Sequence, residues 1–84
     1  MDVAIVILNW NGEKMLRRFL PALVKNTPSQ DAFIVVADNG STDGSLAYLS
    51  EEFPDIRVLP FDRNYGFTGG YNRALQGVEA DYYI

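Results

Sequence analysis

The residue types best suited to ligand chemistry lie together in the stretch ADNGSTDGS, residues 37–45. An apolar run ends at Ala37, Asp38 and Asn39 follow at once, and a helix-starting cluster comes next. This order places a carboxylate where the carboxyl edge of a parallel sheet meets a helix N-terminus. Ligands of open α/β sheets bind in the crevice at that edge. The pattern therefore predicts a ligand site around Asp38.

Composition narrows the chemistry and the partners. The 84 residues include no histidine and no cysteine, so disulfides and thiolate metal sites are excluded and acid–base chemistry falls to Asp and Glu. Seven basic and eleven acidic residues give a net charge of -4, which argues against a sequence-independent hold on nucleic acid or an anionic membrane. The first apolar run, residues 3–8, is too short for a signal peptide or a membrane span. We expect a small ligand, no nucleic-acid partner and a cytoplasmic location.

A second candidate region is the glycine-rich loop NYGFTGGYN, residues 64–72. Gly66, Gly69 and Gly70 permit a close backbone approach, and the following helix points its free N–H groups into the loop, where they suit a pyrophosphate. The alternative is that these glycines only let the helix pack against the sheet. The spacing differs from a dinucleotide fingerprint, because it does not follow the first strand and lacks a ribose-binding acid.

Alternating patterns predict the elements that position these groups. Unbroken apolar runs at residues 3–8 and 33–37 are typical of strands covered on both faces, and residues 56–59 form a shorter strand near the sheet edge. Helical spacing follows each strand: Asn11 is expected to cap the first helix, and a Ser-Thr-Asp cluster the second. The inward faces are predicted to carry Met15, Leu16, Phe19, Leu20, Leu23 and Val24, then Leu46, Leu49 and Phe53, then Tyr71, Ala74, Leu75 and Val78.

Three strand–helix alternations predict one α/β domain with a three-layer α/β/α arrangement. The sheet is expected to be parallel and of the Rossmann-like type, with strand order 3-2-1-4. A fourth apolar run at residues 82–84 stops without a turn or cap, so we expect residues 1–84 to be an N-terminal fragment of a larger domain. The uncovered sheet edge of such a fragment favours self-association.

Four motifs in order and spacing, VAIVILNWNG, VVADNGSTDGS, NYGFTGGYNRAL and ADYYI, resemble the N-terminal nucleotide-binding part of family 2 glycosyltransferases. These are inverting enzymes of the GT-A fold, and the similarity is greatest to the rhamnosyltransferase-like branch. The resemblance covers essentially the whole chain. It implies transfer of a sugar from a nucleoside-diphosphate donor to an acceptor hydroxyl, with inversion at the anomeric carbon.

The resemblance also implies roles for individual residues. Asp38 would accept a hydrogen bond from a pyrimidine imide, which favours a UDP- or dTDP-sugar because a carboxylate only accepts; its alternative role is an Asx turn before the next helix. Asn9 would contact the base and ribose, or else form a turn. Arg63 is a better diphosphate candidate than Arg73, because it lies in the loop. The candidate nucleotide-binding residues are Asn9, Asp38, Asn39, Arg63, Asn64, Gly66, Gly70 and Asn72.

No catalytic or metal-binding residue is expected within this chain. The family resemblance implies a divalent metal, Mn or Mg, held by an Asp-x-Asp motif after the fourth strand, and a sugar or glycan acceptor, both for the full-length enzyme, which we expect to be cytoplasmic or peripheral to the inner membrane face. Two alternatives stay open. A sugar nucleotidyltransferase usually carries a glycine-rich basic loop after the first strand, where this chain has NWNG. A non-catalytic α/β nucleotide-binding module of the receiver kind needs a second acid where Asn9 stands.

Overall fold

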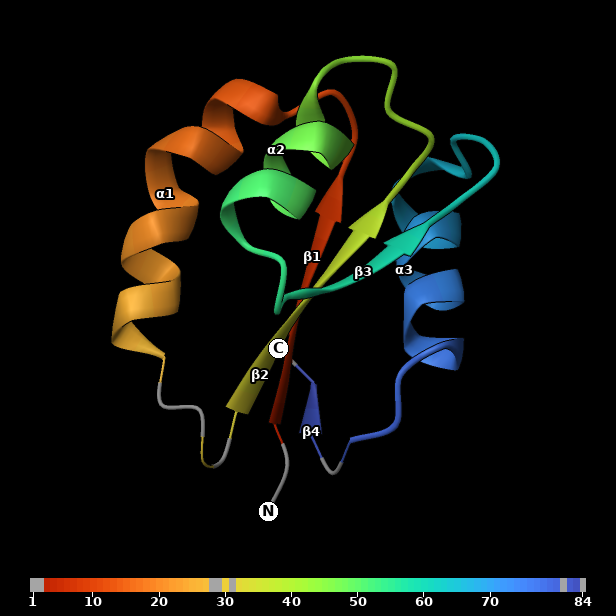
Figure 1. Cartoon of the computed structure of the whole chain (residues 1–84). Coiled ribbons are helices and arrows are strands. Elements are labelled where there is room, and N and C mark those ends of the chain that lie inside the picture. Colours follow the sequence, from red (N-terminus) through yellow and green to blue (C-terminus); the bar gives the residue numbers. More distant parts are fainter. Residues whose placement is uncertain (1–2, 28–29, 31, 81, 84) are drawn as a thin grey trace.

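Strands and helices alternate along the whole chain in a computed structural model that describes residues 3–27, 30, 32–80 and 82–83 (Figure 1). The end of the fourth predicted strand, residue 84, lies outside these described residues. The elements are β1 (Val3–Asn9), α1 (Glu13–Asn26), β2 (Ala32–Asp38), α2 (Ser45–Glu52), β3 (Arg57–Pro60), α3 (Gly66–Gln76) and β4 (Tyr82–Tyr83).

The four strands form one parallel sheet in the order β3-β2-β1-β4, which confirms the predicted order. Asn9 of β1 is level with Asp38 of β2, and Asp38 is level with Pro60 of β3. The ends of these three strands therefore meet at one edge of the sheet. On its other side β1 pairs with β4 at Val3 and Ala4 only, within the residues described. Self-association through that open part of β1 stays a prediction.

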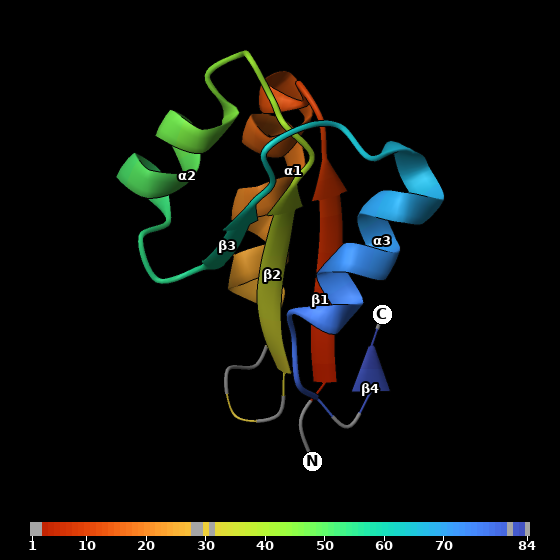
Figure 2. The same cartoon turned by 90° about the vertical axis from the view of Figure 1, so that its right-hand side faces the viewer.

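Helices cover both faces of the sheet, as predicted. The two views show α1 and α2 on one face and α3 on the other (Figures 1 and 2). Successive side chains of β2 pack on opposite faces of the sheet. Val36 packs with Leu16 and Leu49, whereas Val35 packs with Ala74 on the other face. An unbroken apolar run in β2 results from this double burial.

The buried faces of the helices are narrower than predicted. Met15, Phe19, Leu46 and Leu75 were expected to face inward and are exposed. Each helix packs on one face of a small sheet, so only the central row of its apolar residues is covered. Tyr48 is buried in α2, with its ring edge-on to Phe53 at a centroid distance of 5.8 Å.

Candidate functional site

Polar side chains are buried where β1 and β2 end. Asn9, Asp38, Asn39 and Ser45 are all at most 5% exposed. Burial of polar groups is unfavourable unless they are hydrogen-bonded, and no buried side-chain nitrogen or oxygen of the described residues lacks a partner. The predicted site region is thus a satisfied polar network.

Asp38 is the centre of one half of this network. Its Oδ1 accepts hydrogen bonds from Asn9 Nδ2 at 2.9 Å and Ser41 Oγ at 2.8 Å, and its Oδ2 accepts from the Ser41 amide at 2.9 Å. The side chain is 1% exposed. Three donors therefore draw this carboxylate inward, in the Asx-type arrangement given above as its alternative role, and its contact with a nucleotide stays a prediction.

Asn39 holds the other half together. Its Nδ2 donates to Asn64 Oδ1 at 3.1 Å and to the Gly66 carbonyl at 3.0 Å, while its Oδ1 accepts from the Tyr65 amide at 2.8 Å. Asn64 Oδ1 also accepts from the Gly66 amide at 2.7 Å. One buried amide thereby fixes the start of α3 against the end of β2, and it brings three predicted site residues together.

Gly66 and Gly70, both predicted to line the donor pocket, are required for different structural reasons. A Cβ at Gly70 would lie 2.8 Å from Leu8 Cδ1 and 3.0 Å from Asn39 Nδ2, so this glycine permits close helix–strand packing. Gly66 faces open space but has a φ of +76°, a conformation that glycine adopts readily. The packing alternative therefore holds for Gly70.

Two other predicted site residues lie outside the network. Arg63 is exposed and pairs with Asp62 at 3.3 Å, and Asn72 is exposed on α3. Arg73, the less favoured cation, stacks over the Tyr65 ring at 4.0 Å. The structure leaves Arg63 and Asn72 on the surface near α3, without a contact to Asp38 or Asn9.

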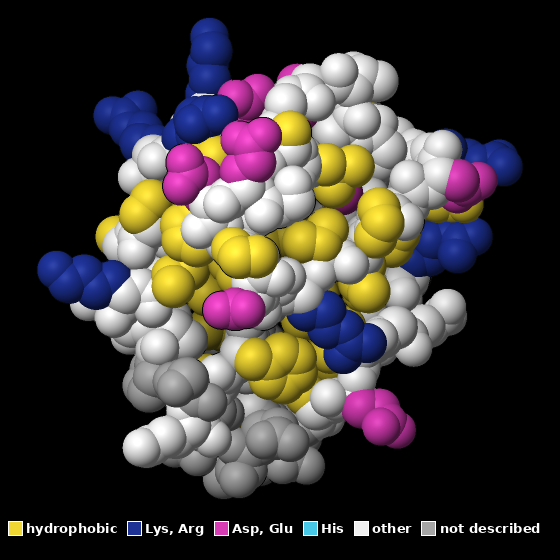
Figure 3. Space-filling model, in the orientation of Figure 1, with side chains coloured by type: hydrophobic (Ala, Val, Ile, Leu, Met, Phe, Trp, Pro, Cys, Tyr) yellow, Lys and Arg dark blue, Asp and Glu magenta, His cyan; other side chains and the backbone are white. Residues whose placement is uncertain are grey.

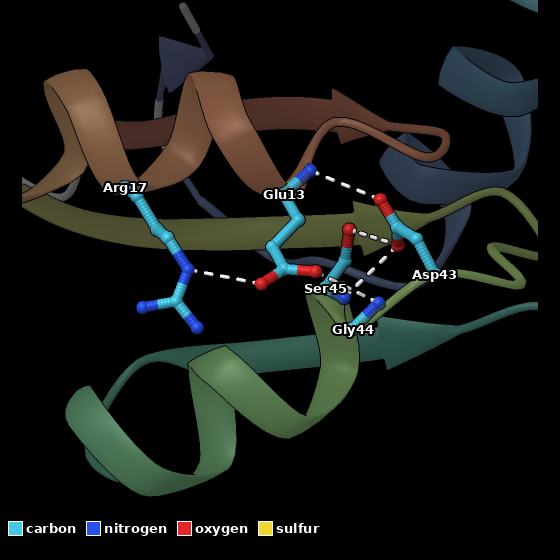
Figure 4. Close-up of polar contacts among 5 residues, drawn as sticks. All are labelled: Glu13, Arg17, Asp43, Gly44 and Ser45. Atoms are coloured by element: carbon cyan, nitrogen blue, oxygen red, sulfur yellow. Dashed lines mark hydrogen bonds and ion pairs between the residues drawn. The ribbon is translucent and has the colours of Figure 1, made fainter.

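The starts of α1 and α2 cap each other (Figure 4). Asp43 Oδ2 accepts from the Glu13 amide at 3.1 Å, and Glu13 Oε1 accepts from the Gly44 amide at 3.0 Å. Asn11 was predicted to cap α1, but its Oδ1 instead accepts from the Thr42 amide at 2.7 Å. The prediction was wrong because the carboxylate of Asp43, thirty residues away, accepts from the Glu13 amide, a pairing that local sequence does not reveal.

The Asp43 carboxyl has a pKa below its ordinary value of 3.8. Burial raises this pKa, but hydrogen bonds from the Ser45 hydroxyl and amide and from the Glu13 amide together outweigh the burial. A lowered folded-state pKa means that the ionised group stabilises the fold above the unfolded value, and that this stability is lost as the pH falls through the folded value.

Replacing Asp43 with alanine is expected to lower the free energy of unfolding by about 1 kcal/mol near pH 6, the usual effect of losing an N-terminal cap. The difference from the unmodified chain should shrink when the pH is lowered below 3.8. Urea unfolding followed by circular dichroism at several pH values measures both. Glu51→Ala, at an exposed α2 position, is the control, and a loss in D43A that does not change with pH contradicts the capping role of the carboxylate.

Trp10 is a further candidate residue, which the sequence motifs did not single out. It follows the buried Asn9 directly and is 55% exposed. Exposed aromatic faces are used to stack nucleobases. The signal was present in the sequence, since the chain's single tryptophan stands between an apolar run and a helix start.

The described residues do not offer a site for a divalent metal. They contain no group of three or more His, Cys, Asp or Glu side chains placed to hold an ion, and three donors occupy the buried carboxylate of Asp38.

No helix in the described part of the chain is long and apolar enough to cross a membrane.

Comparison with known proteins gives this arrangement a family. The sequence matches the family model for glycosyl transferase family 2 over residues 4–84. The chain belongs to glycosyl transferase family 2. The predicted family is thereby confirmed, and the polar network lies at the carboxyl edge of a family 2 glycosyltransferase sheet.

Relatives include the N-acetylglucosaminyl-diphospho-decaprenol L-rhamnosyltransferase of Mycobacterium tuberculosis, 32% identical over 84% of this chain and 23% of the relative. Among solved structures, Staphylococcus aureus TarS 1-349 in complex with UDP-GlcNAc superposes with a TM-score of 0.83 at 27% identity, covering 100% of this chain and 25% of TarS. A mannosyltransferase from Pyrobaculum calidifontis, solved with GDP-Man and Mn²⁺, shares the fold at 21% identity and a TM-score of 0.76, over 94% of this chain and 25% of the mannosyltransferase. The chain spans about a quarter of the length of these glycosyltransferases.

Proposed function

We propose that residues 1–84 form the donor-nucleotide-binding part of an inverting glycosyltransferase, which transfers a sugar from a UDP- or dTDP-sugar to an acceptor hydroxyl. The observation that carries the proposal is the hydrogen-bonded joint between Asn39 and the start of α3, at the carboxyl edge of a parallel sheet. Family membership and the similarity to TarS, solved with UDP-GlcNAc, support it.

The start of α3 suits the diphosphate of the donor. The helix dipole attracts anions at a helix N-terminus, and Asn39 holds this end of α3 in place through Asn64 and Gly66. Arg63, three residues before the first residue of α3, leaves its guanidinium in solvent, where it can pair with phosphate oxygens. The diphosphate is therefore proposed to lie against the 63–67 segment.

The base is proposed to lie near Asp38, with Trp10 as a stacking surface. The Asp38 carboxylate is closed off by the Ser41 hydroxyl, which donates to its Oδ1. Turning the Ser41 side chain about its χ1 bond moves its Oγ away from Oδ1, and the imide N–H of uracil or thymine can then take its place. Cytosine offers a lone pair at the same ring position, so the carboxylate disfavours it.

We further propose that the enzyme uses a divalent cation held by residues other than those described here. The ion would neutralise charge on the leaving diphosphate. Residues 1–84 then contribute donor binding and orientation, without a catalytic base. The acceptor is a sugar or glycan, and the enzyme acts in the cytoplasm.

Nucleotide titration tests the site assignment. UDP or dTDP added to the ¹⁵N-labelled chain is expected to shift the amide signals of residues 38–41 and 64–67 more strongly than ADP does. Asp38→Asn should reduce the response to UDP, whereas Asp55→Asn, at an exposed position away from the site, should leave it unchanged. An equal response to ADP, or a response that survives Asp38→Asn and Asp38→Ala, contradicts the proposed base contact.

A further inference from the structure

The outer face of α1 carries a charge opposite to that of the chain as a whole. Four of the seven basic residues lie in α1, against one of the eleven acidic residues, so this helix has a net charge of +3 while the rest of the chain has -7. The overall charge of -4, which on its own argues against binding to an anionic membrane, is therefore the sum of a basic helix and an acidic remainder.

Three of these cations are in one row on the exposed side of α1. Lys14, Arg18 and Lys25 are separated by four and seven residues, which keeps them on one helix face. All three are exposed, and none pairs with a carboxylate of the described residues. Arg17 differs, because it pairs with Glu13 at 2.9 Å and lies over the Tyr48 ring at 4.5 Å.

An apolar row runs beside the basic row. Met15, Phe19 and Ala22 follow one another at spacings of four and three residues and are exposed, Met15 to 61% and Phe19 to 38%. Figure 3 shows the same combination along the α1 side of the molecule, where dark-blue side chains stand beside yellow ones. Adjacent cationic and apolar rows are typical of helices that lie in a membrane interface.

We propose that α1 binds the surface of an anionic phospholipid bilayer, with the Lys14–Arg18–Lys25 row on the headgroups and the Met15–Phe19–Ala22 row entering the acyl boundary. Long cationic side chains reach lipid phosphates while their stems cover apolar surface. Salt screens the electrostatic field of the acidic residues outside α1 over about 8 Å at physiological ionic strength. The interaction with the membrane is therefore set mainly by the charges on the protein face nearest to it. This proposal does not depend on the proposed nucleotide function.

A bilayer fits this face better than an acidic protein or a nucleic acid. A polyanionic polymer binds through cationic side chains alone, whereas α1 also exposes the apolar side chains of Met15 and Phe19 beside its basic row. Burial of those two side chains in an interface adds to the electrostatic attraction.

Vesicle co-sedimentation of the 84-residue chain tests the proposal. The chain should bind vesicles of phosphatidylcholine with about one third phosphatidylglycerol, and bind pure phosphatidylcholine much less, because each cation near an anionic surface contributes about 1 kcal/mol, or about fivefold in partitioning. Raising the salt from about 50 mM to about 500 mM should weaken binding to the anionic vesicles.

Paired variants locate the binding face. Lys14→Gln with Arg18→Gln should lower partitioning by about 25-fold. Arg57→Gln with Arg73→Gln changes the net charge equally and, being outside α1, should change partitioning by about twofold or less. Met15→Ser with Phe19→Ser should lower it by about tenfold at both salt concentrations. Circular dichroism confirms that each variant is folded.

Three results would overturn the proposal. The first is equal binding to neutral and anionic vesicles, and the second is an equal loss in the two cation variants, which would show that only net charge matters. The third is retention by RNA or polyglutamic acid that requires Lys14 and Arg18, with no retention by anionic vesicles; that outcome would assign α1 to a polyanion.

Discussion

Replacing Asp38 with alanine will lower the free energy of unfolding by about 3 kcal/mol, because it leaves several buried donors without an acceptor. Asn9 Nδ2 and the Ser41 amide both donate to this carboxylate, which is 1% exposed. Urea unfolding followed by circular dichroism measures the change.

Two further substitutions separate the lost hydrogen bonds from lost volume. Asp38→Asn keeps the size of the side chain but turns one acceptor into a donor that faces other donors, and it should cost about half as much as alanine. Asp55→Ala, at an exposed position, should change stability by less than about 0.5 kcal/mol. A loss below that value for Asp38→Ala would show that the carboxylate does not hold the two strand ends together.

Replacing Gly40 with alanine will also destabilise the fold strongly, by about 3 kcal/mol from a left-handed backbone and a backbone clash combined. Gly40 has a φ of +76°, and its added Cβ would lie 2.7 Å from the Arg63 carbonyl carbon and 2.9 Å from the Asn64 nitrogen. Those are main-chain atoms, so no side-chain rotation relieves the contact. The 40 loop and the 63–64 segment would have to separate.

Gly66 provides a matched control for this prediction. It has the same φ of +76°, but its Cβ would meet nothing within 4 Å, so Gly66→Ala should cost only about 1 kcal/mol. The difference between the two variants in urea unfolding isolates the clash at Gly40. Equal losses would mean that the two loops can move apart freely, and the proposed support of α3 by β2 would then fail.

The architecture was predictable from the sequence because burial on both faces leaves an unmistakable pattern. An unbroken apolar run such as residues 33–37 is typical of a strand buried on both faces, and its alternation with helices predicts a parallel sheet. The helix faces were less predictable. Helical spacing alone places both Met15 and Leu16 on the predicted inward face. The sheet is too narrow to cover both, so Leu16 is buried and Met15 is exposed.

The candidate site was predictable in location and not in orientation. Parallel strands bring their ends to one edge, so Asn9, Asp38 and Asn39 were expected together and are found together. Their bonding depends on partners far away in sequence, such as Ser41 turned toward Asn9, or Asn64 turned toward Asn39. The cationic face of α1 escaped notice for a related reason, because a net charge does not say where the charges lie.

The pairing of Val3 with Tyr82 has a consequence for how the chain folds. It joins a strand near residue 3 to a strand near residue 83, so the order β3-β2-β1-β4 is complete only after nearly all of residues 1–84 have been synthesised. The two strands of every pair in this sheet are also separated in sequence by at least one helix. Such long-range pairing slows folding and prolongs the lifetime of aggregation-prone intermediates. A nascent chain that has released β1 and β2 but not β4 therefore presents a bare backbone edge, the kind of surface that chaperones protect.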